Sequence, residues 1–153
     1  MSATGLEVFD KTLQTTNIWL DEIMAEIGPD RHVAWHVLGA VLRALRDRLP
    51  IGLSAHLGAQ LPILVRGLYY DQWRPTEEAL KLRSREEFLE RVAEDLKDTR
   101  PVNVTKSVKA VFQVLNHHIE PGQVEKVRQA LPESVRTLWP DAANRKGNVQ
   151  SAA

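Results

Sequence analysis

The chain carries the stretch Leu61-Pro62-Ile63-Leu64-Val65-Arg66-Gly67-Leu68-Tyr69 and repeats its pattern as Leu131-Pro132-Glu133-Ser134-Val135-Arg136-Thr137-Leu138-Trp139. Both stretches hold leucine, proline, valine, arginine and leucine in one register, followed by an aromatic residue. The separation is 70 positions (131 minus 61). Chance does not keep five such identities together, so the pattern predicts an internal repeat.

The register extends outward from these stretches. At the same separation Gly52 matches Gly122, and Leu45 matches Leu115. Nearer the N-terminus the separation falls by one, so that Ile23 matches Val92. A duplicated unit of about 70 residues explains both halves of the chain.

Helical spacing of apolar residues runs through both halves. One helix is expected over about 6–27, because alternating steps of three and four put its apolar residues on one face. These residues are Leu6, Phe9, Leu13, Thr16, Leu20, Ile23 and Ile27. Further helices are expected over about 31–49, 53–60, 85–97 and 104–119, after Pro121, and in short segments near residues 62 and 132. Pro62 either opens a fourth short helix or kinks the third.

The predicted fold is all-α: two tandem repeats of a three-to-four-helix unit, packed as one compact bundle with pseudo-two-fold symmetry. The expected boundaries are 1–76 for the first unit and 77–140 for the second, with a disordered polar tail over 141–153. A unit this small buries little surface alone, so the two are expected to pack together. The matched pairs Glu26/Asp95 and Arg66/Arg136 suggest one ion pair in each unit.

Composition argues against several classes of protein. The 153 residues include 20 basic and 20 acidic side chains. Nucleic-acid binders usually carry a basic excess, so no nucleic-acid partner is expected. The absence of cysteine removes disulfides, thiolate catalysis and cysteine metal sites. No secretory signal or apolar run of about 20 residues is evident, so a cytoplasmic location without a membrane partner is expected.

The segment from Trp35 to Pro75 ends in Gln60-Leu-Pro-Ile-Leu-Val-Arg-Gly-Leu-Tyr-Tyr-Asp-Gln-Trp-Arg-Pro75. It resembles the bacterial domain-of-unknown-function 2267 family, most distinctively in Tyr69-Tyr70-x-x-Trp73-x-Pro75. The segments 86–92 and 121–140 fit the same family. The resemblance covers nearly the whole chain apart from both ends. It implies a small helical fold in a bacterial cytoplasmic protein, and it supplies no catalytic residues.

An aromatic and basic seam joins the two units. It consists of Arg66, Tyr69, Tyr70, Trp73 and Arg74. Trp, Tyr and Arg are the residues that most often carry the binding energy of an interface. These side chains either recognise a partner or pack the join against both units, and the sequence leaves both readings open.

His32 and His36 are the candidate metal ligands, because residues four apart share one side of a helix. No glutamate follows His32, as a metalloprotease motif would require. Both histidines lie away from the apolar side of their helix, which favours a solvated edge, so no metal or other cofactor is expected. The neighbours His117 and His118 point in different directions on a helix, which weakens them as joint ligands.

No catalytic constellation is present in the sequence: there is no Glu-x-x-His pair, glycine-rich phosphate loop or nucleophile elbow. The leading hypothesis is a non-catalytic helical protein–protein interaction module that binds another protein or a second copy of itself. One alternative is a small-molecule or metal-binding protein, enzymes included, with its site between the two units. The other alternative is a weak nucleic-acid binder.

Overall fold

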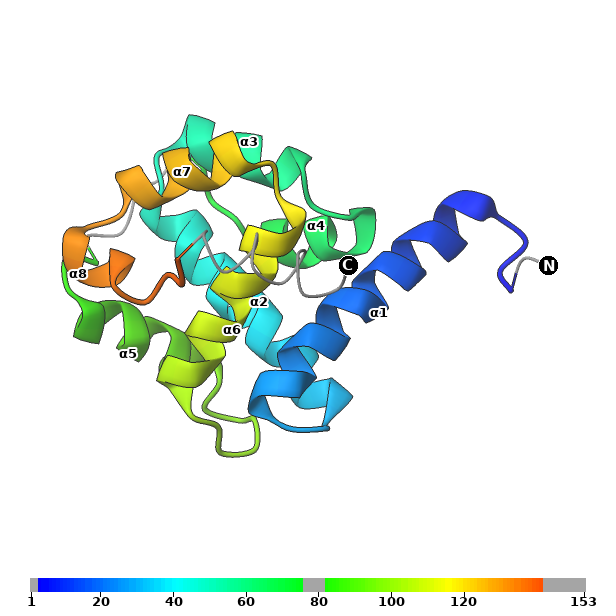
Figure 1. The fold of residues 1–153 in the computed structure, drawn as a ribbon, viewed down its shortest axis with the longest axis horizontal. Coiled ribbons are helices and arrows are strands. Elements are labelled where there is room, and N and C mark those ends of the chain that lie inside the picture. The colour runs from blue at the N-terminus through cyan, green and yellow to red at the C-terminus, as the bar shows by residue number, and fades with distance from the viewer. Residues whose placement is uncertain (1–2, 76–81, 142–153) are drawn as a thin grey trace.

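The computed structural model describes residues 3–75 and 82–141, and the regular structure within these ranges is entirely helical (Figure 1). The all-α prediction is therefore confirmed. The first half contributes α1 (Glu7–Ile27), α2 (Arg31–Arg48), α3 (Ile51–Ala59) and α4 (Ile63–Tyr70). The second half contributes α5 (Arg85–Asp95), α6 (Val104–His118), α7 (Pro121–Ala130) and α8 (Glu133–Arg136). Disorder is predicted for residues 141–153, and all of these except Asp141 lie outside the described residues.

Side-chain caps fix where several helices begin. The side chains of Asp30, Ser84 and Asn103 each accept a hydrogen bond from a backbone N–H in the first turn of α2, α5 and α6. Pro62 is the N-cap of α4, with φ −54° and ψ 148°, one position before the first helical residue. α3 and α4 are thus two helices separated by a break. None of the helices described is long and apolar enough to cross a lipid bilayer.

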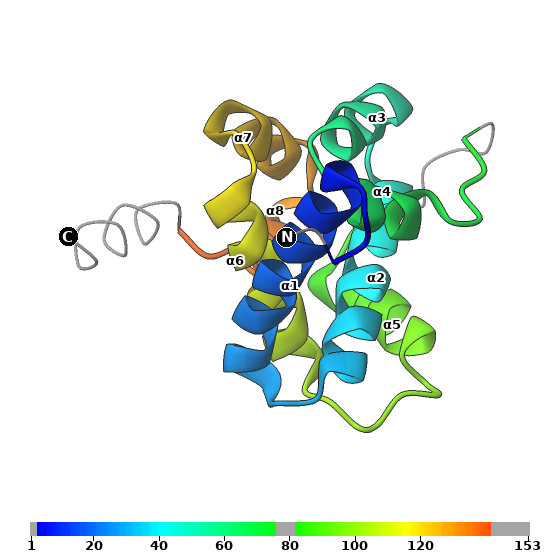
Figure 2. The same cartoon turned by 90° about the vertical axis from the view of Figure 1, so that its right-hand side faces the viewer.

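The two halves pack against each other through several pairs of helices. α1 contacts α6 and α5 contacts α2, while α2 and α6 meet each other near the centre. α3 and α7 lie side by side at one end of the bundle (Figure 2). If α1, α2 and α3 are exchanged with α5, α6 and α7, the α1–α6 contact becomes the α5–α2 contact, and the α2–α6 and α3–α7 contacts are unchanged. A pseudo-two-fold axis requires such a pattern. Superposition of residues 18–70 on 87–139 is the direct test of that predicted symmetry.

One hydrophobic core runs through both units. α2 is apolar on more than one side, and its residues Val37, Leu38, Val41 and Leu45 are fully buried. On α6 the inward residues are Val108, Val111, Phe112 and Leu115. The rings of Phe88, Phe112 and Trp139 form a continuous aromatic run, with centroids 6.0 Å and then 4.1 Å apart. The two units therefore complete a single core between them.

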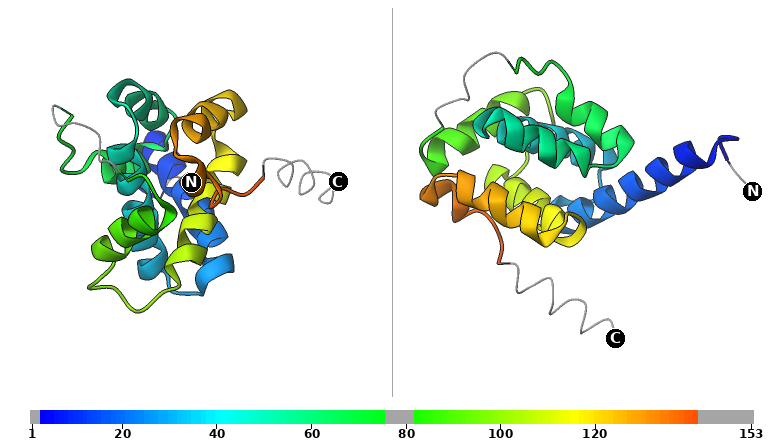
Figure 3. Two further views of the ribbon diagram at one scale, coloured as in Figure 1. Left: turned by 90° about the vertical axis from the view of Figure 1, so that its left-hand side faces the viewer. Right: turned by 90° about the horizontal axis from the view of Figure 1, so that it is seen from above.

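The N-terminal half of α1 extends beyond the bundle (Figures 1 and 3). The apolar face expected for this helix is buried from Thr16 to Ile23 and partly buried at Ile27. Before Thr16, Leu6, Phe9 and Leu13 are 51%, 53% and 42% exposed. Periodicity thus identifies the face correctly, but the described residues cover only its second half.

Candidate functional site

A charged cleft of about 570 Å³ opens between the two units, where α2, α5 and the segment after α4 meet. Its lining includes Arg43, Arg46, Asp47, Asp71, Trp73, Arg74, Arg91, Glu94, Asp95 and Lys97. The small-molecule alternative expects a site between the two units, and the cleft lies there. Trp73 and Arg74 are the two predicted seam residues that it includes.

Ion pairs across the cleft join α2 to α5. Asp47 accepts from Arg46 Nε at 2.7 Å and from Arg91 Nη2 at 3.1 Å. Arg43 donates from Nε and Nη2 to Asp95 Oδ2 at 3.1 and 3.0 Å. A charged ligand would have to displace these contacts, so the arrangement favours a structural role for the cleft.

Arg46 is the most deeply placed of these charges, with only 5% of the residue exposed. Its Nη1 donates to the backbone oxygens of Tyr69 and Asp71 at 2.8 and 2.9 Å. Asn116 stands 70 positions later (116 minus 46) and donates from Nδ2 to the backbone oxygen of Pro140 at 3.0 Å. In both units a buried polar side chain at one repeat position thus holds the chain that follows the last short helix.

Two seam residues have structural partners. Tyr69 is fully buried, its hydroxyl donates to the Ser54 carbonyl at 2.9 Å, and burial raises the phenol pKa well above its usual value. Tyr70 donates to the Ala55 carbonyl at 3.3 Å and stacks on Trp73 with ring centroids 5.3 Å apart. The turn between Tyr70 and Trp73 places Gln72 at φ 59°, a left-handed conformation that is uncommon outside glycine.

Arg66 lies away from the cleft and binds the end of α3. It donates to the backbone oxygens of Gly58, Ala59 and Leu61, each at 3.0 Å. Its repeat partner Arg136 donates to the Leu131 carbonyl at 3.0 Å. The ion pair predicted in each unit is therefore wrong, because both arginines instead bind the backbone that precedes their short helix. Of the five seam residues, only Trp73 and Arg74 line the cleft, and their role in binding stays a prediction.

His32 and His36 are both exposed on α2, as the solvated-edge prediction requires. Within residues 3–75 and 82–141, no group of three His, Asp or Glu side chains could hold a metal ion.

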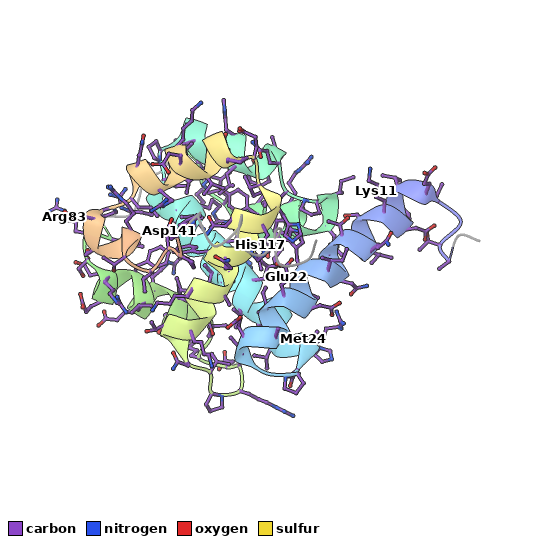
Figure 4. All side chains as sticks on the ribbon, viewed as in Figure 1. Lys11, Glu22, Met24, Arg83, His117 and Asp141 are labelled. Carbon is purple, nitrogen blue, oxygen red and sulfur yellow. The ribbon has the colours of Figure 1, made fainter. Side chains whose placement is uncertain are left out.

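A histidine–glutamate cluster that the sequence did not reveal links α1 to α6. His117 Nδ1 and His118 Nε2 contact the two carboxylate oxygens of Glu22, beside which His117 lies in Figure 4. Trp19 stacks on His118 with centroids 5.5 Å apart. Although adjacent side chains leave a helix in different directions, both imidazoles reach this carboxylate, because His117 uses the nitrogen near its backbone and His118 its distal nitrogen.

The cluster continues as a hydrogen-bonded chain into the core. Gln113 Nε2 lies 3.0 Å from His117 Nε2, and Asn116 Nδ2 donates to Gln113 Oε1 at 3.1 Å. Trp139 Nε1 donates to Asn116 Oδ1 at 2.7 Å. With the amides so placed, His117 accepts at Nε2 and donates from Nδ1 to Glu22, so every link in the chain is satisfied.

The second candidate site is an apolar surface on the projecting part of α1. We call the N-cap residue Leu6, Phe9 and Leu13 of α1, and Ile63 and Leu64 of α4, the apolar arm. Ile63 and Leu64 are 56% and 40% exposed, and the Leu64 N–H donates to Thr12 Oγ1 at 3.1 Å, which places the start of α4 against α1. Thr4 binds Asp10 Oδ1 through its N–H at 3.1 Å and its hydroxyl at 2.8 Å, which anchors the chain before α1.

The model of the family described as "Uncharacterized conserved protein (DUF2267)" matches residues 16–138. The chain belongs to the DUF2267 family. The match includes both units, the charged cleft and the histidine–glutamate cluster, and it begins at Thr16, where α1 enters the bundle. The part of the apolar arm on α1 therefore precedes the region shared with the DUF2267 family. No curated protein matches the chain.

Gly58 provides the space for the seam of this DUF2267 protein. A Cβ atom at Gly58 would lie 2.2 Å from the Tyr70 hydroxyl oxygen. Gly58→Ala is therefore expected to displace the Tyr70 ring and lower the free energy of unfolding by about 1–3 kcal/mol. Gly67→Ala is the matched control, because a Cβ there meets nothing within 4 Å. It should stabilise the protein by about 0.5–1 kcal/mol through helix propensity. Equal effects in thermal unfolding would contradict this packing.

The Glu22 cluster predicts how the stability of this DUF2267 protein depends on pH. Burial raises the pKa of Glu22, but its hydrogen bonds and charge interactions with His118 and His117 bring it below the ordinary 4.5. A carboxylate whose pKa is lower in the folded state than in the unfolded state stabilises the fold at pH values above the unfolded-state pKa. This stabilisation is lost as the pH falls through the folded-state pKa. Glu22→Gln should thus cost about 1 kcal/mol at pH 7, a figure reduced for partial exposure, and progressively less below pH 4.5.

The exposed Glu26, one turn further along α1, provides the control. Glu26→Gln should leave urea unfolding nearly unchanged at every pH. A Glu22→Gln cost that stayed constant down to pH 2 would show that the carboxylate charge does not hold α1 on α6.

Proposed function

We propose that this protein is a non-catalytic helical module that binds an apolar protein surface through its apolar arm, in the bacterial cytoplasm. The observation that carries the proposal is the exposed half of the α1 face, with Phe9 at 53% and Leu13 at 42% exposure. Apolar anchors at helical spacing, left uncovered by their own bundle, are typical of helix-mediated recognition.

The repeat gives independent support. α1 has 21 residues and its counterpart α5 has 11. In the register that matches Ile23 with Val92, the first residue of α5 corresponds to Thr16. The second unit thus completes its share of the core without a helical extension like the N-terminal part of α1, so the core does not require that part. An extension that the fold does not need, and that exposes apolar side chains, is best explained by a binding role.

The charged cleft supports a small-molecule function less well. Asp47 and Asp95 are already engaged by arginines at hydrogen-bond distance. Ligand pockets are usually lined mainly by apolar side chains with a few polar groups, and this lining is largely charged. We therefore assign the binding role to the apolar arm.

Site-specific photo-crosslinking in cells of the native host tests the proposal. A benzophenone side chain at Phe9 should give a protein adduct on illumination. The same probe at Ile18 should not, because Ile18 is 46% exposed but lies on the opposite side of α1. Absence of an adduct at position 9, or equal adducts at both positions, would contradict the proposal.

A further inference from the structure

We infer that the partner is a second copy of this chain, bound with the two apolar arms side by side and antiparallel. This inference rests on the proposed function and names the partner. It starts from the shape of the exposed stripe, in which Leu6, Phe9 and Leu13 follow steps of three and four along one helical face.

The stripe is self-complementary about its centre. A two-fold axis that passes near residue 11 puts Phe9 of one copy opposite Leu13 of the other, and Leu13 opposite Phe9. It also carries Leu6 of each copy toward the α4 end of its partner, where Ile63 and Leu64 are exposed. One symmetric contact thus uses every member of the apolar arm, and closed two-fold pairs are the commonest oligomers of soluble proteins.

Charge does not oppose the contact. Helix geometry places Glu7 and Lys11 on the side of α1 opposite the stripe, and Asp10 is bound by Thr4. The whole chain has formal net charge zero, so two copies do not repel each other strongly. A partner that relied on strong charge of one sign would find no complementary charge on this stripe.

The charges also argue against a lipid surface as the occupant. Helices that lie on membranes usually carry several lysines or arginines on the polar face. The exposed part of α1 has a single Lys11 beside Glu7 and Asp10. Two copies of the chain bury the stripe without requiring such a basic face.

Sedimentation equilibrium of the purified full chain at micromolar to millimolar concentrations tests the inference. Wild type should show a concentration-dependent monomer–dimer equilibrium. The double variant Phe9→Ser/Leu13→Ser should weaken dimerisation at least about tenfold. Ile18→Ser is the matched control, because it removes an exposed apolar residue of the same helix on the opposite side and should dimerise like wild type.

Circular dichroism shows whether each variant keeps its helices, and Ile63→Ser/Leu64→Ser provides a second disruption that leaves α1 unchanged. Weaker dimerisation in both double variants supports the inference. A wild type that stays monomeric at millimolar concentration would overturn it, as would a dimer that none of these changes affects. If the adduct at position 9 then contains a different protein, the second copy is ruled out as partner while the proposed function stands.

Discussion

Replacing Trp139 by alanine is expected to lower the free energy of unfolding by about 3–5 kcal/mol, the usual cost of removing a large buried aromatic ring. Trp139 is 5% exposed and stacks on Phe112 with centroids 4.1 Å apart. The cavity would open in the core shared by the two units, so both should lose stability together. Urea unfolding followed by circular dichroism measures the loss.

Trp139→Phe separates the ring from its hydrogen bond. Phenylalanine keeps most of the stack on Phe112 but leaves Asn116 Oδ1 without the indole N–H that lies 2.7 Å away. The expected cost is about 1–3 kcal/mol. An alanine variant that costs no more than the phenylalanine variant would mean that the stack contributes little to the core.

Arg46→Ala is expected to cost about 3–5 kcal/mol, because it removes an arginine that binds both a partly buried carboxylate and two backbone oxygens. Among the residues that the structure describes, Asp47 would then retain only Arg91, whose side chain is 41% exposed. The backbone oxygens of Tyr69 and Asp71 would lose contacts of 2.8 and 2.9 Å. Chemical denaturation at neutral pH gives the change in unfolding free energy.

Two substitutions at the same position identify the source of this effect. Arg46→Lys keeps the charge but cannot bind Asp47 with two nitrogens and reach the backbone oxygens as well, so most of the loss should remain. Arg46→Asn introduces the residue that stands at the equivalent position of α6, and it should recover part of the backbone anchoring. Full recovery by lysine would show that charge alone matters at Arg46.

Most of the fold could be predicted from the sequence because the repeat constrains it twice. The matched Pro62 and Pro132 place a helix break at one position in both units, and the structure shows φ and ψ of −54° and 148° at the first and −55° and 148° at the second. The apolar spacing of α2 and α6 identifies their buried sides. Periodicity does not report how far the rest of the bundle extends, which is why the exposure of Phe9 could not be predicted.

The polar side chains that hold neighbouring segments together were harder to predict, because the repeat preserves their positions and not their residue types. Arg46 and Asn116 share a register and a task but not a side chain. The contact between α5 and α2 also keeps its position while its residue types change. Arg91 matches Glu22 (91 minus 22 is 69), and Asp47 matches His117 (117 minus 47 is 70). The pair Arg91–Asp47 thus joins α5 to α2 as the pair Glu22–His117 joins α1 to α6. A search for identical residues misses such exchanges of charge. A search for polar residues at matched repeat positions would have found them.

The exposed part of α1 lies outside both the repeat and the region matched to the DUF2267 family. Its proposed role therefore concerns this chain, and other DUF2267 proteins without such an extension are expected to be monomeric under the same conditions. The shared region, with its cleft and its histidine–glutamate cluster, is expected to keep its fold when the arm is disrupted.

The most direct measurement of the proposed pairing is the distance between two spin labels, one on each copy. The chain has no cysteine, so Lys11→Cys introduces a single labelling site on the far side of α1 from the stripe. Two antiparallel helices that meet at residue 11 place the labels about 20–30 Å apart, given the diameter of each helix. A narrow double electron–electron resonance distance in that range would confirm the paired arms. A sample without any dipolar interaction between labels at millimolar concentration would contradict them.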